Sequence, residues 1–245
     1  MTYTNITVPV TTPAPTPLSL SQKNDTAPVS CPTGQLLAEV NLKTDTKPEE
    51  TSWDIVDATT KMAVFSFQAD AQQQVATINT SVCLDESKLY FLIINDAGGN
   101  GMRSLVQGYW RLSINGSIKS SGSTFQYHDG YFGIGSWPSC TNENTELMSL
   151  LLQTDNNGNQ TSWTIQNNTT RKVLFANTVQ LRNNALYAYH RCVPVGSILV
   201  FTIYDSGKNG LCCNHGHGFF AMFYNGTEVL KGERFAASRS VTLAT

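Results

Sequence analysis

The chain has 245 residues, 16 of them basic and 18 acidic, so the formal net charge is −2 and only 14% of residues are charged. Hydrophobic residues make up 40%, which is enough to bury cores and excludes a chain that is disordered throughout. No cluster of Lys or Arg is present, which argues against nucleic acid and anionic lipid as partners. The longest apolar run, residues 198–203, has the length of a strand, so no membrane span is expected.

The first 34 residues differ in composition from the rest. Residues 11–17 read Thr-Thr-Pro-Ala-Pro-Thr-Pro, and the stretch has no periodic apolar pattern. We expect an extended Thr/Pro-rich arm or stalk that forms no core alone and could carry O-linked glycans. Parts of it alternate like a strand added to another sheet, and we predict self-association through this arm. The alternating apolar residues are Ile6, Val8, Val10, Leu18 and Leu20.

Beyond the arm the sequence repeats itself. The shift is 109 residues from Cys31 to Cys140 and 110 residues from Asp45 to Asp155, with the other landmarks in the same order. Agreement in order and spacing predicts two homologous modules. We expect module one at residues 35–135, a joint at 136–143 and module two at 144–245.

Apolar residues within each module alternate with a period of two, and no segment keeps a helical period over three turns. The predicted strands of module one lie at residues 36–42, 53–56, 62–67, 88–95 and 109–114. Those of module two lie at residues 147–152, 163–165, 172–175, 198–204 and 219–224. The pattern predicts an all-β protein of two tandem antiparallel β-sandwich modules, jelly-roll or immunoglobulin-like, preceded by the extended arm.

The repeated motifs resemble a known kind of extracellular module. Module two reads Thr154-Asp155, then Gln160-Thr-Ser-Trp163, then Asp205-Ser-Gly-Lys-Asn209-Gly-Leu-Cys-Cys213. This order is similar to tandem β-modules with a Thr-Asp…Glu-Thr-Ser-Trp…Asp-x-x-Gly-Asp-Gly-x-Cys-Cys pattern in secreted and surface proteins of algae such as diatoms and of marine bacteria. The resemblance covers both modules but not the arm. It implies an extracellular, non-catalytic module.

Module one departs from that pattern. It has Met102-Arg-Ser104 where module two has Leu211-Cys-Cys213, so it lacks one disulfide element. The second acidic position of the turn is occupied by Asn100 in module one and by Asn209 in module two.

Six cysteines, an even number, fit an oxidising compartment. Cys31 and Cys83 are 52 residues apart, and so are their equivalents Cys140 and Cys192. A disulfide inside each module, Cys31 with Cys83 and Cys140 with Cys192, is the simplest pairing.

Cys212 and Cys213 are adjacent and have two possible pairings. They can bond to each other, which elimination favours once the other four are paired, or each to a separate partner. Together with His215 and His217 they also have the composition of a zinc site. In an oxidising compartment disulfides are favoured over zinc thiolates.

The chain has eight Asn-x-Ser/Thr acceptor sites for N-linked glycans, where its content of Asn, Ser and Thr predicts about four by chance. They are Asn5, Asn24, Asn79, Asn115, Asn159, Asn167, Asn168 and Asn225. With the cysteines they predict a secreted or cell-surface glycoprotein. The first residues lack a basic start and an apolar core, so we expect the numbered chain to be a mature or truncated form.

Two glycine-rich loops carry the hard oxygen ligands that calcium prefers. An Asp and an Asn lie in each loop, and a further Asp follows the first strand of each module. If these residues converge, they predict a calcium site in each module; otherwise the loops are ordinary turns in which Asp and Asn cap their own backbone. The six candidate ligands are Asp45, Asp96, Asn100, Asp155, Asp205 and Asn209.

Catalytic motifs are missing from the sequence: it has no Gly-x-Ser-x-Gly, no His-Glu-x-x-His, no Walker loop and no dinucleotide fingerprint. His128, Asp129 and His190 have no nucleophile beside them in a motif, so we expect no enzyme. Aromatic residues such as Trp53 and Trp163 either stack on sugars or belong to the cores.

These features predict a non-catalytic structural or adhesive glycoprotein, such as a subunit of a filament, coat or matrix. The alternative is a carbohydrate-binding protein or an accessory module of a secreted hydrolase.

Overall fold

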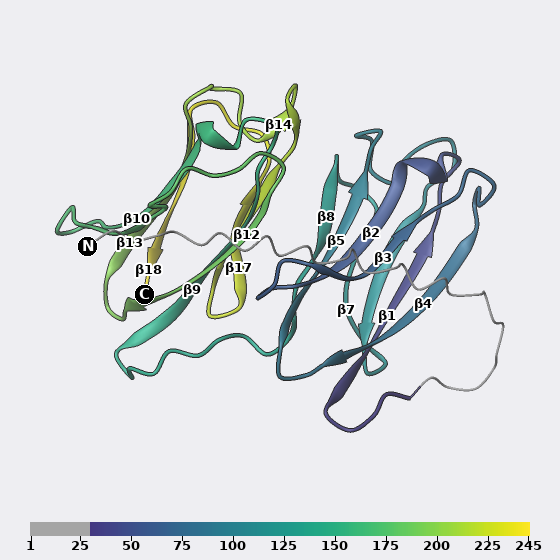
Figure 1. The fold of residues 1–245 in the computed structure, drawn as a ribbon, viewed down its shortest axis with the longest axis horizontal. Coiled ribbons are helices and arrows are strands. Elements are labelled where there is room, and N and C mark those ends of the chain that lie inside the picture. The colour runs from purple at the N-terminus through teal and green to yellow at the C-terminus, as the bar shows by residue number, and fades with distance from the viewer. Residues whose placement is uncertain (1–29) are drawn as a thin grey trace, which may run out of the picture.

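The computed structural model describes residues 30–245, and in that range the chain is almost entirely β-structure (Figure 1). The predicted arm lies mostly outside the described residues, so its association role stays a prediction. None of the helices in the described range is long and apolar enough to cross a membrane.

Module one is a sandwich of two antiparallel four-stranded sheets, with strand orders β4-β1-β6-β7 and β3-β2-β5-β8. A one-turn 3-10 helix, η1 (Pro48–Glu50), precedes β2. The strands are β1 (Gln35–Lys43), β2 (Thr51–Asp57), β3 (Ala63–Gln68), β4 (Thr77–Asp85), β5 (Leu89–Asp96), β6 (Tyr109–Ile114), β7 (Ser117–Gly122) and β8 (His128–Gly135).

Module two repeats this plan with strand orders β12-β9-β16-β17 and β11-β10-β13-β18, and it adds a two-stranded ribbon, β14-β15. Its 3-10 helix is η2 (Gly158–Gln160). The strands are β9 (Thr145–Gln153), β10 (Thr161–Asn167), β11 (Val173–Ala176), β12 (Leu186–Pro194), β13 (Ile198–Asp205), β14 (Cys212–Cys213), β15 (Gly216–His217), β16 (Phe219–Tyr224), β17 (Thr227–Gly232) and β18 (Ser238–Ala244). The all-β sandwich prediction is confirmed.

The strand sequences show which faces are buried. In β1 only alternate residues are apolar and buried: Ala38, Val40 and Leu42 enter the core, while Glu39 and Asn41 face outward. β5 is different, because nearly every residue from Leu89 to Asp96 is buried. Since successive side chains of a strand point to opposite faces, β5 must be covered on both sides.

Three strands of each module were missed by the periodicity: β4, β7 and β8, and their counterparts β12, β17 and β18. β7 follows the Asn115-Gly116 turn and carries a single apolar residue, Ile118, which is 60% exposed. β8 contains three glycines. Such strands are held by hydrogen bonds to their neighbours and by the hairpin turns, so their own side chains give little apolar signal.

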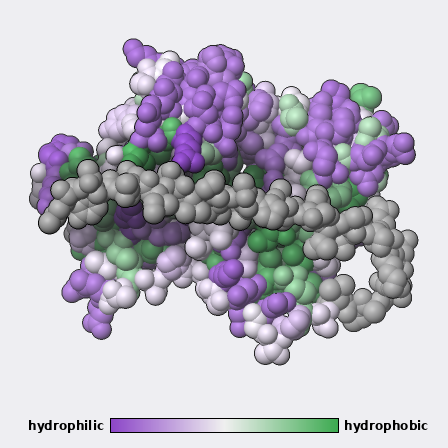
Figure 2. All heavy atoms as spheres, in the orientation of Figure 1, coloured by the Kyte–Doolittle hydropathy of each residue, from purple (hydrophilic) through white to green (hydrophobic). Residues whose placement is uncertain are grey.

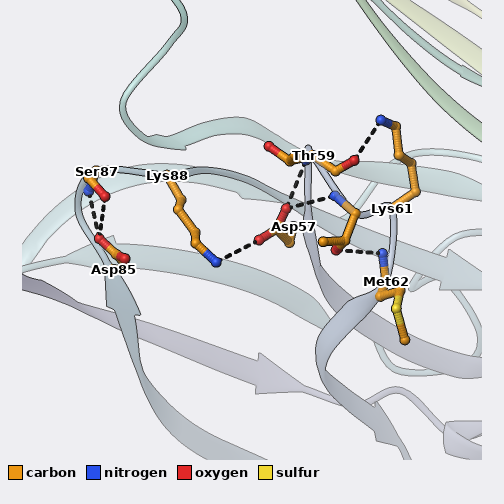
Figure 3. Close-up of polar contacts among 8 residues, drawn as sticks. Asp57, Thr59, Lys61, Met62, Asp85, Ser87 and Lys88 are labelled. Carbon is orange, nitrogen blue, oxygen red and sulfur yellow. Dashed lines mark hydrogen bonds and ion pairs between the residues drawn. The ribbon is translucent and has the colours of Figure 1, made fainter. Parts of the chain in front are cut away.

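A charged contact ties two turns of module one together (Figure 3). Oδ1 of Asp57 accepts hydrogen bonds from the backbone N–H groups of Thr59 (2.8 Å) and Thr60 (3.0 Å), which closes the β2-β3 turn. Oδ2 of Asp57 lies 3.3 Å from Nζ of Lys88 in the β4-β5 turn. Burial raises the pKa of Asp57, but the hydrogen bonds from Thr60 and Thr59 and the charge of Lys88 outweigh it and lower the pKa below its ordinary value.

A third apolar core lies between the modules, in addition to the core inside each sandwich. In Figure 1 the four sheets stand side by side, with the β3-β2-β5-β8 sheet of module one facing the β12-β9-β16-β17 sheet of module two. The buried members of this core are Val56, Ala58, Leu89, Phe91, Ile93 and Phe132 of module one and Leu151, Phe219, Ala221 and Phe223 of module two. This is the second cover that β5 requires.

The repeat shows that this inner face is specific to one sheet of each module. By strand register, Phe91 pairs with Val56 and Phe132, whereas the equivalent Val200 pairs with the polar Gln166 and Thr242. The other sheet diverges in the opposite sense, since Leu151 pairs with Ala221 in module two but Asn41 pairs with Arg111 in module one. The two faces that meet are therefore apolar, and their equivalents on the outside of the molecule are polar.

The joint between the modules packs against module two. The ring of Trp137 lies 5.2 Å from that of Phe223 and 6.3 Å from that of His190, measured between centroids. Its indole also contacts the hairpin tip at Gly226, where an added Cβ would come within 3.1 Å of Nε1. The linker thus extends the third core and does not act as a free tether.

Candidate functional site

The predicted ligand residues lie in loops at the same end of the two modules, the upper end in Figure 1. In module one the loop after β5 is attached to its neighbours by Ala97 N–H, which donates to Glu50 O (2.8 Å), and by Asp96 N–H, which donates to Tyr127 O (2.8 Å). Module two makes the same bonds from Ser206 to Gln160 (3.0 Å) and from Asp205 to Ala237 (2.9 Å). Hydrophilic residues gather over this end of both modules (Figure 2).

Each loop Asp caps its own turn. Oδ2 of Asp96 accepts hydrogen bonds from the N–H groups of Asn100 and Gly101, both at 2.8 Å, and Oδ2 of Asp205 accepts them from Asn209 (2.7 Å) and Gly210 (2.8 Å). Both Asp residues are buried, with exposed fractions of 2% and 3%. One oxygen of each carboxylate therefore serves the ordinary glycine-turn role.

The two Asp residues after the first strands are also buried, and each caps the 3-10 helix that follows. Oδ1 of Asp45 accepts a hydrogen bond from Lys47 N–H (2.7 Å), and Oδ1 of Asp155 accepts one from Asn157 N–H (2.8 Å). Burial raises the pKa of Asp155, and the charge of Asp205 raises it further. In module two the two predicted carboxylates therefore lie close enough to interact.

In module one the charge that acts on Asp96 comes from a residue that the sequence did not single out. Burial raises the pKa of Asp96, the N–H groups of Gly101, Asn100 and Gly98 lower it, and the charge of Glu50 raises it. Glu50 ends η1, and its carboxylate lies against Gly98, where an added Cβ would be 2.2 Å from Oε2. Three oxygens at this place could serve as cation ligands: Glu50 Oε2, Asp96 Oδ1 and Asn100 Oδ1.

The disulfides are those that the spacing predicts. Cys31 bonds to Cys83 and Cys140 to Cys192, with Cα–Cα distances of 5.5 and 5.8 Å. These bonds fasten the start of each module to its β4 or β12 strand.

Cys212 and Cys213 bond to each other, so elimination gave the right pairing. The zinc alternative loses its thiolates, because both sulfur atoms are used in this bond. His217 Nδ1 lies 3.9 Å from Sγ of Cys212, and Arg234 Nη2 lies 3.1 Å from Sγ of Cys213. The residues pack around the disulfide and present no open set of metal ligands.

The aromatic residues considered for sugar stacking belong to the cores. Trp53, Trp110 and Trp163 are each 1% exposed, and Phe220 is fully buried. Only Tyr109 remains half-buried at the surface, with the guanidinium of Arg111 5.7 Å from its ring centroid. The stacking interpretation is therefore wrong for the tryptophans.

The glycan acceptors that the structure describes lie at turns and on outer strands. Asn115 and Asn225 occupy equivalent exposed hairpin tips with φ of 49° and 47°. Their Oδ1 atoms accept hydrogen bonds from Leu37 N–H (2.9 Å) and Leu147 N–H (3.0 Å). These bonds use the oxygen and not the nitrogen that would carry a glycan.

The remaining acceptors have different surroundings. Asn79 is exposed on β4, and Asn159 is exposed in η2. Asn167 and Asn168 are half-buried, and Oδ1 of Asn167 closes a turn by accepting from Thr169 N–H and Thr170 N–H, as Asp57 does in module one. Asn5 and Asn24 lie outside the described residues.

The histidines lie at the module boundary. Nδ1 of His128 is 2.9 Å from Oδ1 of Asn95, and its Nε2 is hydrogen-bonded to the backbone carbonyl of His217. Burial lowers the pKa of His128 to about 4. Its neighbour Asp129 accepts a hydrogen bond from Trp110 Nε1 (3.0 Å) and lies 3.7 Å from Lys231 Nζ of module two. Burial raises the pKa of Asp129 despite these contacts.

One serine–histidine pair was missed by the sequence motifs. Oγ of Ser149 lies 2.8 Å from Nδ1 of His190. Ser149 is 3% exposed and belongs to β9 of the sheet that faces module one. A buried hydroxyl has no path to a substrate, so this pair serves packing at the boundary.

A cleft of about 250 Å³ opens along the same boundary. Both modules line it, and its wall combines aromatic rings with carboxylates and an amide. The lining includes Phe125, Gln126, Asp129, Phe219 and Glu233. Burial raises the pKa of Glu233, which Arg234 partly offsets.

No protein-family model, curated protein or solved structure matches this chain. The structure defines the class as a tandem antiparallel β-sandwich protein with three disulfides. The resemblance to algal and marine-bacterial surface modules stays a prediction.

Proposed function

We propose that this chain is a non-catalytic structural or adhesive glycoprotein of an extracellular assembly, such as a filament, coat or matrix. The observation that carries the proposal is the third apolar core, which joins the two sandwiches face to face. A chain whose modules are fused through ten buried side chains behaves as one stiff bar. Stiffness over two modules suits a load-bearing or spacing element.

The outer faces of the bar support the same function. They carry polar residues at the positions where the inner faces are apolar, such as Asn41 and Arg111 at one end of the stack and Gln166 and Thr242 at the other. Asn79 lies exposed on an outer strand, where a glycan would be solvated. Disulfides within the modules suit an oxidising, extracellular setting.

Association between copies is assigned to the arm, residues 1–34. The Cys31–Cys83 disulfide fixes the point at which the arm joins module one, beside the edge strand β4. An edge strand has unpaired backbone groups and can accept an added strand. A strand contributed by the arm of a second copy would extend a sheet without using the polar faces.

Electron microscopy and sedimentation of the full chain and of a version beginning at Ser30 test this function. We expect the full chain to form regular polymers at high concentration and the shortened chain to stay monomeric with an unchanged circular dichroism spectrum. Equal polymerisation of both versions would make the arm a linker only. Monomers of the full chain under every condition would contradict the structural function itself.

The boundary cleft favours a second candidate function, carbohydrate binding. Aromatic rings beside carboxylates and amides are the groups that bind sugars, and Phe125, Gln126 and Glu233 supply them here. A glycan array with the monomeric protein separates the two functions. Specific binding that is lost in Phe125→Ala would favour the carbohydrate-binding function.

A further inference from the structure

Three oxygen atoms in one loop pocket of module one are buried without a hydrogen-bond partner. They are Oε2 of Glu50, Oδ1 of Asp96 and Oδ1 of Asn100. Among the described residues the other buried polar atoms in this condition are two indole nitrogens and one tyrosine hydroxyl in other places. Buried acceptors normally find a donor, so a cluster of three acceptors points to a ligand that is positively charged.

The chain builds this pocket from two elements that are joined by backbone hydrogen bonds. Glu50 comes from η1, and Asp96 and Asn100 come from the loop after β5, which Ala97 N–H binds to Glu50 O. Gly98 lies between the two loop ligands, and any side chain there would displace the Glu50 carboxylate. The glycine therefore keeps the space in which the oxygens face one another.

Asp96 meets the requirement of a buried side chain aimed into the pocket, because only 2% of it is exposed and one of its two oxygens is satisfied. The Gly98 N–H is near enough to affect the Asp96 carboxyl but forms no hydrogen bond with Oδ1. Glu50 keeps its other oxygen, Oε1, for Lys47 Nζ at 3.2 Å. One oxygen of each carboxylate remains for a ligand.

Module two offers a comparison within the same chain. Gln160 replaces Glu50, and an added Cβ on Gly207 would lie 2.1 Å from its Oε1 and 2.5 Å from Oδ1 of Asn209, so the geometry is repeated. The pocket has lost one negative charge, and Oδ1 of Asp205 accepts a hydrogen bond from Gly207 N–H at 3.3 Å. Module two therefore has neither the charge nor the full set of unpartnered acceptors.

We propose that Glu50, Asp96 and Asn100 form a divalent-cation site in module one, suited to calcium, and that the equivalent pocket of module two does not bind the ion. Calcium takes six to eight oxygen ligands at about 2.3–2.6 Å and tolerates irregular geometry, so carbonyl groups and water complete the shell. Magnesium requires near-octahedral geometry and loses its water reluctantly, so it binds more weakly. The ion ties η1 to the β5 loop. This site is independent of the function proposed above.

The matched experiment exchanges the one ligand that differs between the modules. Glu50→Gln installs the side chain that module two has at this position, and Gln160→Ala removes the equivalent residue from module two. Calorimetric titration of the full, chelator-treated chain with calcium chloride should give one ion per chain. We expect Glu50→Gln to weaken binding at least about tenfold, the scale on which metal sites respond to lost contacts, and Gln160→Ala to leave it unchanged.

Thermal melts provide the second readout and show that each variant is folded. Calcium that binds only the folded chain raises its melting temperature by mass action, so 5–10 times the dissociation constant, a range chosen on the same mass-action argument, should shift the wild type and Gln160→Ala but not Glu50→Gln. The proposal is overturned by an absence of calcium heat with the folded wild type, by equal affinities in wild type and Glu50→Gln, by two ions per chain, or by tighter magnesium than calcium binding.

Discussion

The rings of Phe132 and Phe219 stack across the boundary between the two modules, with centroids 6.0 Å apart and an interplanar angle of 20°. Both residues are buried, with exposed fractions of 8% and 7%. In module two the residue equivalent to Phe132 is Thr242, which is exposed. The stacked pair is therefore a device for joining the modules and is not required by the sandwich fold.

Replacing Phe132 by alanine should uncouple the modules. A Phe→Ala change in a core costs about 3–5 kcal/mol, and here that loss falls on the boundary. We expect the single calorimetric unfolding transition of the wild type to divide into two. Thr242→Ala, at the equivalent outer position, is the matched control and should keep one transition; two transitions in both or in neither would contradict the boundary role of Phe132.

Stability should depend on His128 between pH 6.5 and about 4. Burial lowers its pKa to about 4 in the folded chain, against 6.5 when unfolded. The unfolded chain therefore takes up the proton first, and the contribution of His128 is full above pH 6.5 and is lost as the pH falls through the folded pKa. The raised pKa values of Asp96, Asp129 and Glu233 act in the opposite direction.

Because several groups titrate together, the difference between wild type and His128→Gln isolates the histidine. Urea unfolding at a series of pH values should give a difference in unfolding free energy that falls by at most about 1.4 kcal/mol per pH unit within this window. Asp54 and Lys61, which line the same boundary cavity as His128, stay unchanged in the comparison. Parallel curves for the two proteins would show that His128 is protonated in the folded state.

The disulfides should contribute unequally to stability. Cys31–Cys83 and Cys140–Cys192 each close a separation of 52 residues, so removing either by paired serine substitution should cost about 4 kcal/mol in the chain-entropy model. Cys212–Cys213 closes no loop of consequence and should cost far less. Urea unfolding of the three double variants measures this order, and peptide mapping without reductant should recover each pair; an equal cost for all three would refute the loop-length argument.

Asn115 should combine two separable roles, as a glycan acceptor and as a turn residue. Its φ is 49°, and its Oδ1 accepts the Leu37 N–H. Aspartate tolerates this backbone conformation and retains the acceptor, so Asn115→Asp should abolish glycosylation at this site with an almost unchanged melting temperature. Asn115→Ala should lose about 1 kcal/mol or more because both features are lost. Intact mass and thermal melts measure the two effects, and equal melting temperatures for the two variants would exclude the turn role.

Much of the fold could be predicted from the sequence because the repeat and the alternation both reflect the two sandwich cores. Residues 36–42 and 109–114 were expected as strands and lie within β1 and β6. β7 and β8 could not be expected, because Ser117–Gly122 and His128–Gly135 gain their strand geometry from neighbours. The face-to-face packing had a signal in the divergence between Phe91 and Val200, which periodicity alone does not weigh.

The candidate cation site could be predicted only in part. Asp96 and Asn100 follow an apolar strand in a glycine-rich loop, so their role as turn or ligand residues is visible in the sequence. Glu50 is brought to them by η1 and by the hydrogen bond from Ala97, a tertiary contact with no spacing rule. The repeat did contain the relevant difference, Glu50 against Gln160, at the start of the Thr-Ser-Trp motif.

The one-sided apolar face of module one has a consequence for biosynthesis. Ribosomes add roughly 5–20 residues per second, and about 90 residues separate Phe132 from Phe223. Module one can fold as soon as β8 has emerged, yet its boundary face stays bare for several seconds until β16 has been made. During that interval the nascent chain presents Val56, Phe91 and Phe132 to other chains. A chain terminated near Trp137 would keep that face permanently and should accumulate as aggregates or chaperone complexes.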